Sequence, residues 1–172
     1  RYYVDNTINR KSKIKSQKHE NVIKNAIYKA GDDPREINRV VAQTLSDLSD
    51  NLVITGIAEE DDFFKIGLSG LFEMPEFREF DRAFRLTSFF DEFEELFDRI
   101  ESKFFALPSE ALAKEGHVRV FIGHENPVKD IRDETVMFAR YNLPQNLTGS
   151  LTLVGPTRMD YAKNIALIKN TT

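Results

Sequence analysis

The first periodic stretch of the chain lies between residues 17 and 48, where apolar side chains recur three or four positions apart. This spacing predicts amphipathic helices. A first helix is expected over residues 17–30 and ends at Gly31, because glycine adopts the left-handed conformation that terminates helices. Asp33 is expected to cap a second helix that has Pro34 in its first turn. The stripe positions of the two helices are Val22, Ile23, Ala26, Ile27 and Ala30, then Ile37, Val40, Val41, Thr44, Leu45 and Leu48.

Other stretches are rich in β-branched residues and bounded by turn residues, a pattern that predicts strands. Helices and strands are grouped along the chain rather than alternating, so we predict an α+β fold with an antiparallel sheet. Pro144, Gln145 and Asn146 occupy the turn between the last two strands. The predicted strands cover residues 52–57, 63–66, 118–122, 135–142 and 147–154.

A long amphipathic stretch from residue 75 to residue 105 carries phenylalanines at helical spacing. Twelve of the 14 phenylalanines lie between Phe63 and Phe105, so this region is expected to supply much of the core. Any ring left exposed would form a surface for a partner. The stripe is Phe77, Phe80, Phe84, Phe90, Phe93, Phe97, Ile100 and Phe104.

Near the C-terminus an apolar run meets a Gly155-Pro156 pair, and an amphipathic run follows. The pair is expected to end the last strand, because proline lacks the N–H that a strand ladder needs. Thr157 is expected to cap the final helix, with Asp160 at the spacing of a capping box. Strand, turn and capped helix therefore explain most of this segment without a function.

Composition limits the protein class. The chain has 172 residues, of which 41% are hydrophobic, enough for one compact domain with a real core. No apolar run approaches a membrane-spanning length, and the N-terminus shows no signal-peptide pattern. The chain contains no cysteine, which excludes disulfides, thiolate catalysis and cysteine zinc sites. These features fit a cytoplasmic protein.

Charge is distributed unevenly. The first 30 residues hold eight basic and two acidic side chains, a net charge of +6. Residues 59–101 hold 14 acidic and 5 basic side chains, a net charge of −9. A basic N-terminal segment is typical either of a surface that faces nucleic acid or of a solvated linker, and the charge alone is consistent with both. The candidate phosphate contacts are Arg10, Lys11, Lys13 and Lys15.

Catalytic and metal-binding patterns are weak. His124 and Glu125 form a single pair without a third ligand, and Ser69 lies outside a G-x-S-x-G pattern. The acidic run at residues 59–62 lacks the alternating spacing of a calcium loop. We therefore expect no enzyme activity, no metal and no cofactor.

Residues 155–161 have the sequence Gly-Pro-Thr-Arg-Met-Asp-Tyr. This sequence resembles the closing motif of the HrcA family of heat-inducible transcription repressors. Any one such motif is weak, but several in the family's order are fairly specific. The other segments that resemble the family are residues 1–5, residues 67–71 with 75–77, residues 120–126 and residues 141–149.

This resemblance implies a GAF-like regulatory domain over residues 17–172, preceded by a linker over residues 1–16 and an absent winged-helix DNA-binding domain. Family members repress chaperone genes by binding an inverted-repeat operator called CIRCE, and the chaperonin GroEL is thought to keep them active. Operator DNA and the chaperonin are therefore the partners that the resemblance implies. The alternative function is a small-molecule-sensing GAF-like module of another regulator.

The chain departs from the family at residues 58–62, where typical members carry a long inserted dimerising domain. An inverted-repeat operator requires a protein with two-fold symmetry, so we expect a homodimer. Without the inserted domain it would form through helical faces or through the DNA-binding domain. Our hypothesis is that Arg158 or Tyr161 ties the last helix to the domain or faces the DNA-binding domain. The candidate interdomain contacts are Gly155, Pro156, Thr157, Arg158, Met159, Asp160 and Tyr161.

Overall fold

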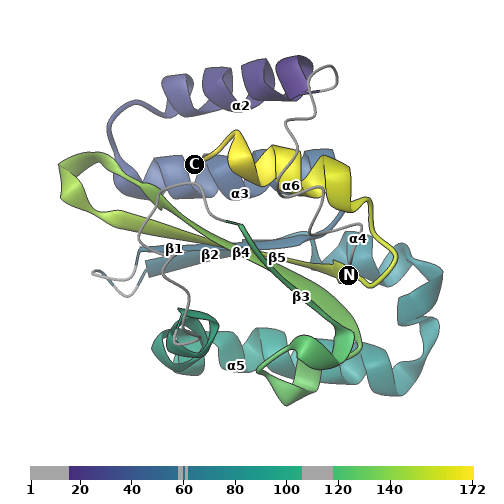
Figure 1. Ribbon diagram of the computed structural model, residues 1–172. Coiled ribbons are helices and arrows are strands. Elements are labelled where there is room, and N and C mark those ends of the chain that lie inside the picture. Colours follow the sequence, from purple (N-terminus) through teal and green to yellow (C-terminus); the bar gives the residue numbers. More distant parts are fainter. Residues whose placement is uncertain (1–15, 58–59, 61, 106–117) are drawn as a thin grey trace.

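A five-stranded antiparallel sheet with helices on both faces forms the α+β fold in the computed structural model, which describes residues 16–57, 60, 62–105 and 118–172 (Figure 1). The strand order is β2-β1-β5-β4-β3. The predicted α+β class and the antiparallel sheet of a GAF-like domain are confirmed. The strands are β1 (Leu52–Ile57), β2 (Asp62–Ile66), β3 (Arg119–Ile122), β4 (Glu134–Asn142) and β5 (Thr148–Pro156).

The strand pairing follows the chain closely. β4 and β5 form a hairpin through the short 3-10 helix η6 (Pro144–Asn146) and pair from Glu134 opposite Pro156 to Asn142 opposite Thr148. β1 adds to the other side of β5, with Leu52 opposite Val154. Only residues 58–61 separate β1 from β2, so this chain has no inserted domain at that point.

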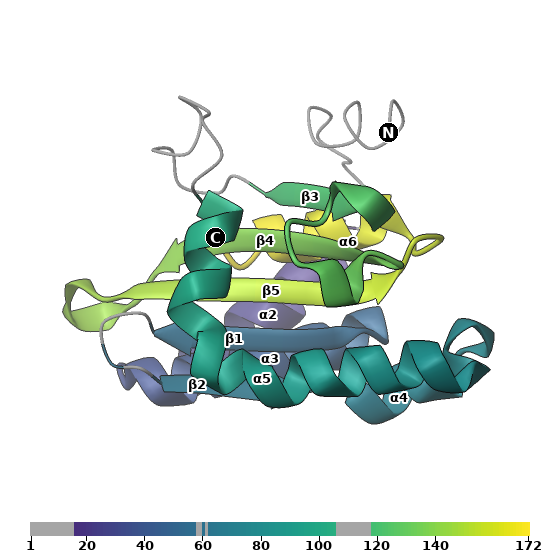
Figure 2. The same cartoon turned by 90° about the horizontal axis from the view of Figure 1, so that it is seen from below.

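Helices cover both faces of the sheet (Figures 1 and 2). Helix α3 and helix α6 lie on one face, with α2 outside them, while α4, η2 and α5 lie on the other. Asp33 caps α3, since its Oδ1 accepts the Arg35 N–H at 2.9 Å, as predicted. The helix bounds are α2 Ser16–Ala30, α3 Pro34–Ser49, α4 Leu68–Glu73, η2 Pro75–Arg78, α5 Phe80–Phe105, η4 Gly123–Glu125, η5 Lys129–Ile131 and α6 Tyr161–Lys169.

The sheet separates two apolar layers, because successive side chains of a strand point to opposite faces. On the side of α3 and α6, the layer is largely aliphatic. On the side of α5, it is rich in phenylalanine. Members of the first layer include Ile37, Val41, Leu45, Val53, Met137, Leu153, Ile165 and Ile168, and members of the second include Leu52, Ile54, Phe77, Phe89, Phe93, Phe121, Phe138 and Val154.

The predicted end of the last strand is wrong. Strand β5 continues through Gly155 to Pro156, while its pairing with β1 ends at Val154. Pro156 therefore lies where β5 is paired on one side only, a place where proline is tolerated. Thr157 is also not the cap of the last helix. Asp160 caps α6 instead, since its Oδ1 accepts the Lys163 N–H at 3.0 Å.

The aromatic stripe is only partly core. Phe77 and Phe93 are buried as predicted, but Phe80 is 79% exposed and Phe84 62% exposed. The expected stripe assumed one continuous helical period from residue 75. The structure has a 3-10 helix there and starts α5 only at Phe80, which rotates these two rings away from the sheet. The side chains of Phe97, Ile100 and Phe104 lie outside the described part of the chain.

Candidate functional site

Segments that resemble the repressor family, far apart in the sequence, meet at one corner of the fold. We define the motif corner as Asn51, Gly67, Glu76 and residues 155–161. Asn51 connects α3 to β1, Gly67 precedes α4, and Glu76 belongs to η2. Residues 155–161 connect β5 to α6. The corner thus joins helices from both faces of the sheet.

Asn51 is the centre of the motif corner and is only 2% exposed. Its backbone N–H donates to Ser49 Oγ at 3.2 Å, and its Nδ2 donates to the Ser49 carbonyl at 2.8 Å. Its own carbonyl accepts a hydrogen bond from Ser46 Oγ at 3.1 Å. The Nδ2 bond fixes the orientation of the side chain, and the other two bonds hold the backbone of Asn51 at the end of α3.

Two glycines of the motif corner pack directly against Asn51. A methyl group on Gly155 would overlap the Asn51 side-chain oxygen and would lie 2.6 Å from Met159 Cε. A methyl group on Gly67 would overlap the Asn51 carbonyl and lie 2.5 Å from Ser46 Oγ, and Gly67 also has a φ of +99°. Only glycine fits such close backbone approaches. The corner therefore depends on both glycines.

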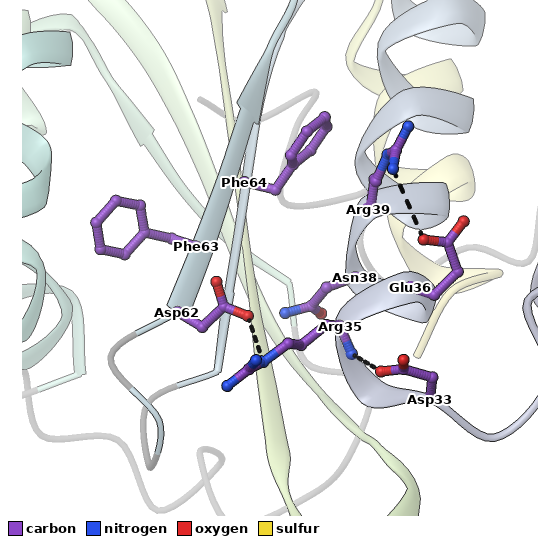
Figure 3. Close-up of a pocket in the computed structure, with 8 residues that line it drawn as sticks. All are labelled: Asp33, Arg35, Glu36, Asn38, Arg39, Asp62, Phe63 and Phe64. Carbon is purple, nitrogen blue, oxygen red and sulfur yellow. Dashed lines mark hydrogen bonds and ion pairs between the residues drawn. The ribbon is translucent and has the colours of Figure 1, made fainter.

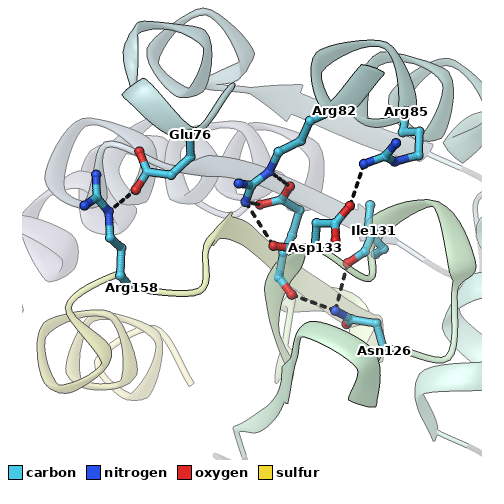
Figure 4. A network of polar contacts seen from close by, with 8 residues as sticks. Glu76, Arg82, Arg85, Asn126, Ile131, Asp133 and Arg158 are labelled. Carbon is cyan, nitrogen blue, oxygen red and sulfur yellow. Dashed lines mark hydrogen bonds and ion pairs between the residues drawn. The ribbon is translucent and has the colours of Figure 1, made fainter. Parts of the chain in front are cut away.

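An ion pair crosses the motif corner from one layer to the other (Figure 4). Arg158 Nε donates to the Glu76 carboxylate, which joins the turn before α6 to η2. This hydrogen bond holds the pKa of Glu76 below its usual value. Arg158 itself is 69% exposed, so water screens the pair and its contribution to stability is small.

Tyr161 and Met159 anchor the same segment from inside. The Tyr161 hydroxyl donates to the Thr157 carbonyl and lies 3.0 Å from Thr135 Oγ1 in β4. Met159 is buried, and its sulfur accepts a hydrogen bond from Asn164 Nδ2 at 3.2 Å. Both Arg158 and Tyr161 thus contact elements outside α6. Contact of either with a DNA-binding domain remains a prediction.

A second polar network connects α5 to the start of β4 (Figure 4). Arg82 donates to both Glu134 carboxylate oxygens, at 2.7 and 2.8 Å, and to the Asp133 carbonyl at 2.9 Å. Burial of Glu134 raises its pKa, and the Arg82 guanidinium opposes that rise. Asn126, the last residue of the 120–126 motif, has its Nδ2 within hydrogen-bond distance of the Ile131 and Glu134 carbonyls.

The motif corner lines a cavity of about 280 Å³. The side-chain oxygens of Asn51 and Asn164 are buried and have no hydrogen-bond partner among the residues that the structure describes. Ionic and apolar groups both contribute to the wall. The lining residues are Ser49, Asp50, Asn51, Met74, Pro75, Glu76, Pro156, Arg158, Met159, Asp160, Lys163 and Asn164.

A second cavity, also of about 280 Å³, lies between the start of α3 and β2 (Figure 3). Its cations already have partners. Arg35 Nε lies 3.1 Å from Asp62 Oδ2, and Arg39 pairs weakly with Glu36 at 3.9 Å. Glu60 also pairs with Arg35, so the described carboxylates of the acidic turn face an arginine.

Within residues 16–57, 60, 62–105 and 118–172, no group of three or more acidic or histidine side chains is placed to hold a metal ion. No helix in that part of the chain is long and apolar enough to span a membrane. Arg10, Lys11, Lys13 and Lys15 lie outside the described residues, so their proposed phosphate contacts stay predictions.

The fold is similar to that of a solved structure. A crystal structure of a hypothetical protein, solved at 2.2 Å resolution, superposes with a TM-score of 0.58 at 12% sequence identity. The match covers 90% of this chain and 74% of that chain. At this identity the similarity concerns the fold alone.

Sequence comparison is more specific. Heat-inducible transcription repressor HrcA of Lachnoclostridium phytofermentans is 28% identical over 79% of this chain and 39% of its own length. The protein of the same name from Clostridium acetobutylicum is 29% identical over 91% of this chain and 41% of its own length. The chain thus spans about two fifths of these curated relatives. Residues 4–165 match the model of the HrcA protein C-terminal domain, so the chain belongs to the HrcA family.

Proposed function

We propose that this chain is the regulatory domain of a heat-inducible transcription repressor and controls a winged-helix DNA-binding domain attached before Arg1. The observation that carries this proposal is the family match over residues 4–165. The relatives are named as repressors, and the matched part is about two fifths of their length. The remaining part of such a protein would hold the DNA-binding domain.

In the proposed mechanism the domain acts by conformational coupling rather than by chemistry. A partner that binds one state of the domain more tightly shifts the population of repressors able to bind DNA. The motif corner supports this role, because Gly67 before α4 packs against Asn51 after α3, and the Glu76–Arg158 pair joins η2 to the turn before α6. A change at the corner would therefore move both layers.

The proposed partners follow from the family. Through its DNA-binding domain the protein would recognise a CIRCE-type inverted-repeat operator, and a chaperonin such as GroEL would hold the regulatory domain in its active state. An inverted repeat requires a two-fold arrangement of two DNA-binding domains. The proposed location is the cytoplasm, where the chromosome of a bacterium lies.

A second candidate function is small-molecule sensing. The cavity at the motif corner favours it, because the polar residues Asn51 and Asn164 line it beside the charged Glu76, Arg158 and Lys163. The layer between the sheet and α5 argues against a ligand there, since Phe77, Phe89 and Phe93 fill it. A sensor would therefore use the corner rather than the interior.

Operator binding by the complete protein tests the main proposal. We compare the complete repressor with a version that ends before residue 1 of this chain, by fluorescence anisotropy on inverted-repeat DNA. The account expects the truncated protein to differ in operator affinity or in its response to heating. Identical affinity at every temperature contradicts it. A rise in melting temperature of this chain with a nucleoside or an amino acid, abolished by Asn164→Leu, supports the sensor instead.

A further inference from the structure

Large apolar side chains are exposed at two places only within the described part of the chain. Val22 (42% exposed) and Tyr28 (87%) lie on α2. Phe72 (36%), Phe80 (79%) and Phe84 (62%) lie on α4 and α5. Because scattered single residues need no explanation but grouped ones mark interaction sites, these two groups are candidate interfaces.

The group on α4 and α5 is aromatic and acidic. The rings of Phe80 and Phe84 stack at a centroid distance of 6.1 Å and an interplanar angle of 21°. Arg82 and Arg85, which follow on α5, pair with residues at the start of β4. Arg78 is also exposed here, so three carboxylates of this face stand beside one further arginine. We define the aromatic face as Phe72, Glu73, Glu79, Phe80, Asp81 and Phe84, all exposed.

The group on α2 is apolar and basic. Tyr28 and Val22 share the exposed side of this helix with three lysines. Glu20 neutralises only Lys24, at 2.6 Å. We define the basic face as Lys18, Val22, Lys24, Tyr28 and Lys29, all exposed.

The two faces are complementary, but they lie on opposite sides of the molecule. Helix α2 is the outermost helix on the side of α3 and α6, whereas α4 and α5 cover the other face of the sheet (Figures 1 and 2). One copy therefore cannot bring its own faces together. Each face offers exposed aromatic surface to the other, and lysines on one would meet carboxylates on the other.

We propose that copies of this chain associate head to tail, with the basic face of one copy docked on the aromatic face of the next. Such a contact is heterologous, because each copy contributes a different surface. Two copies joined in this way still carry one free face of each kind, so further copies can add.

The expected association is weak. A phenylalanine carries on the order of 200 Å² of surface, so the three exposed rings offer roughly 350 Å² of apolar area. Stable interfaces bury about 800 Å² on each partner. The contact is therefore reversible and depends on charge, and salt weakens it by screening the lysines and carboxylates.

Sedimentation velocity of the full chain tests the proposal. We expect the sedimentation coefficient to rise with protein concentration, and to rise less at about 0.5 M than at about 0.05 M salt. The double substitutions Phe80→Ser with Phe84→Ser, and Val22→Ser with Tyr28→Ser, should each abolish the rise. Gln43→Ala, an exposed change on α3 that belongs to neither face, should leave it unchanged. Thermal melts confirm that each variant remains folded.

Mixing the two double variants distinguishes this arrangement from a symmetric dimer. Each variant keeps one intact face, so a mixture should form a one-to-one complex that cannot grow further. A dimer through two aromatic faces would instead lose association only when Phe80 and Phe84 change, and the mixture would not recover it. That result, or a folded protein that stays monomeric at every concentration, overturns the proposal.

Discussion

The side chain of Asn51 lies directly against the backbone of Gly155, closer than any β-carbon at that position would allow. Asn51 follows α3, and Gly155 lies near the end of β5, so this contact joins two parts of the chain about 100 residues apart. Asn51 also lines the cavity at the motif corner together with Met159, whose Cε would lie 2.6 Å from a methyl group on Gly155. The first residue of the family motif at residues 155–161 must therefore be glycine, because a larger side chain would overlap Asn51.

Gly155→Ala should destabilise the domain by about 2 kcal/mol or more, because the added methyl group overlaps Asn51 and Met159. Urea unfolding measures the change. Gly70→Ala is the matched control, since nothing lies within 4 Å of a methyl group there. It should change the free energy of unfolding by less than about 1 kcal/mol. Equal effects of the two substitutions would refute the packing role of Gly155.

Arg82→Ala should cost about 3 kcal/mol, because it leaves the buried Glu134 carboxylate without its partner. Burial raises the pKa of Glu134 in the folded state, so the folded protein takes up a proton more readily than the unfolded chain. Arg82 holds that pKa down, so its removal raises the pKa of folded Glu134 further. The cost of Arg82→Ala should therefore be larger at pH 7 than at about pH 5, where the unpaired carboxyl takes up a proton. Urea unfolding of both proteins at the two pH values measures this. A pH-independent cost contradicts it.

Tyr161→Phe should cost about 1 kcal/mol, because it removes the hydroxyl that bonds to Thr157 and lies beside the buried Thr135. Thermal or urea unfolding detects a loss of this size. Tyr28→Phe removes a hydroxyl from an exposed side chain and serves as the control, with no change expected. If both substitutions are neutral, Tyr161 does not anchor α6 to β4.

Replacing Arg10, Lys11, Lys13 and Lys15 with glutamine should weaken operator binding by the complete repressor. A plot of the logarithm of affinity against the logarithm of salt concentration falls with a steepness of about 0.9 for each phosphate that a lysine or arginine contacts. Replacing all four side chains should therefore reduce this steepness by up to about 3.6. Anisotropy titrations over a salt series give the slope. An unchanged slope would show that the basic segment does not contact DNA.

The sequence predicted the element types well where periodicity is strong. The caps and spacing of the first two long helices follow from Asp33, Pro34 and Gly31, and the structure has both helices. The strand pattern likewise predicted the antiparallel sheet, because β-branched residues bounded by turns carry a local signal. Local sequence therefore predicts an element well where neighbouring residues alone determine its type and its ends.

Tertiary contacts explain the errors. Pro156 remains in β5 because pairing with β1 has already ended at Val154, which the sequence of β5 cannot show. Phe80 and Phe84 have core-like spacing, but the turn at η2 sets which side of α5 faces the sheet. The roles of Asn51 and Asn126 were missed because each depends on partners elsewhere in the fold. Gly67 and Gly155, which lie within the motifs and pack against Asn51, gave a signal that some residue approaches them closely.

The temperature dependence of operator binding tests the regulatory claim most directly. We compare the complete repressor with its Gly155→Ala and Gly70→Ala variants by anisotropy on inverted-repeat DNA, and record the melting temperature of the regulatory domain in each. We expect the Gly155→Ala repressor to release the operator at a lower temperature, by about the amount that the domain's melting temperature falls, while the Gly70→Ala repressor behaves like the unmodified protein. Operator release at an unchanged temperature, despite a destabilised domain, would contradict the claim that this domain controls DNA binding.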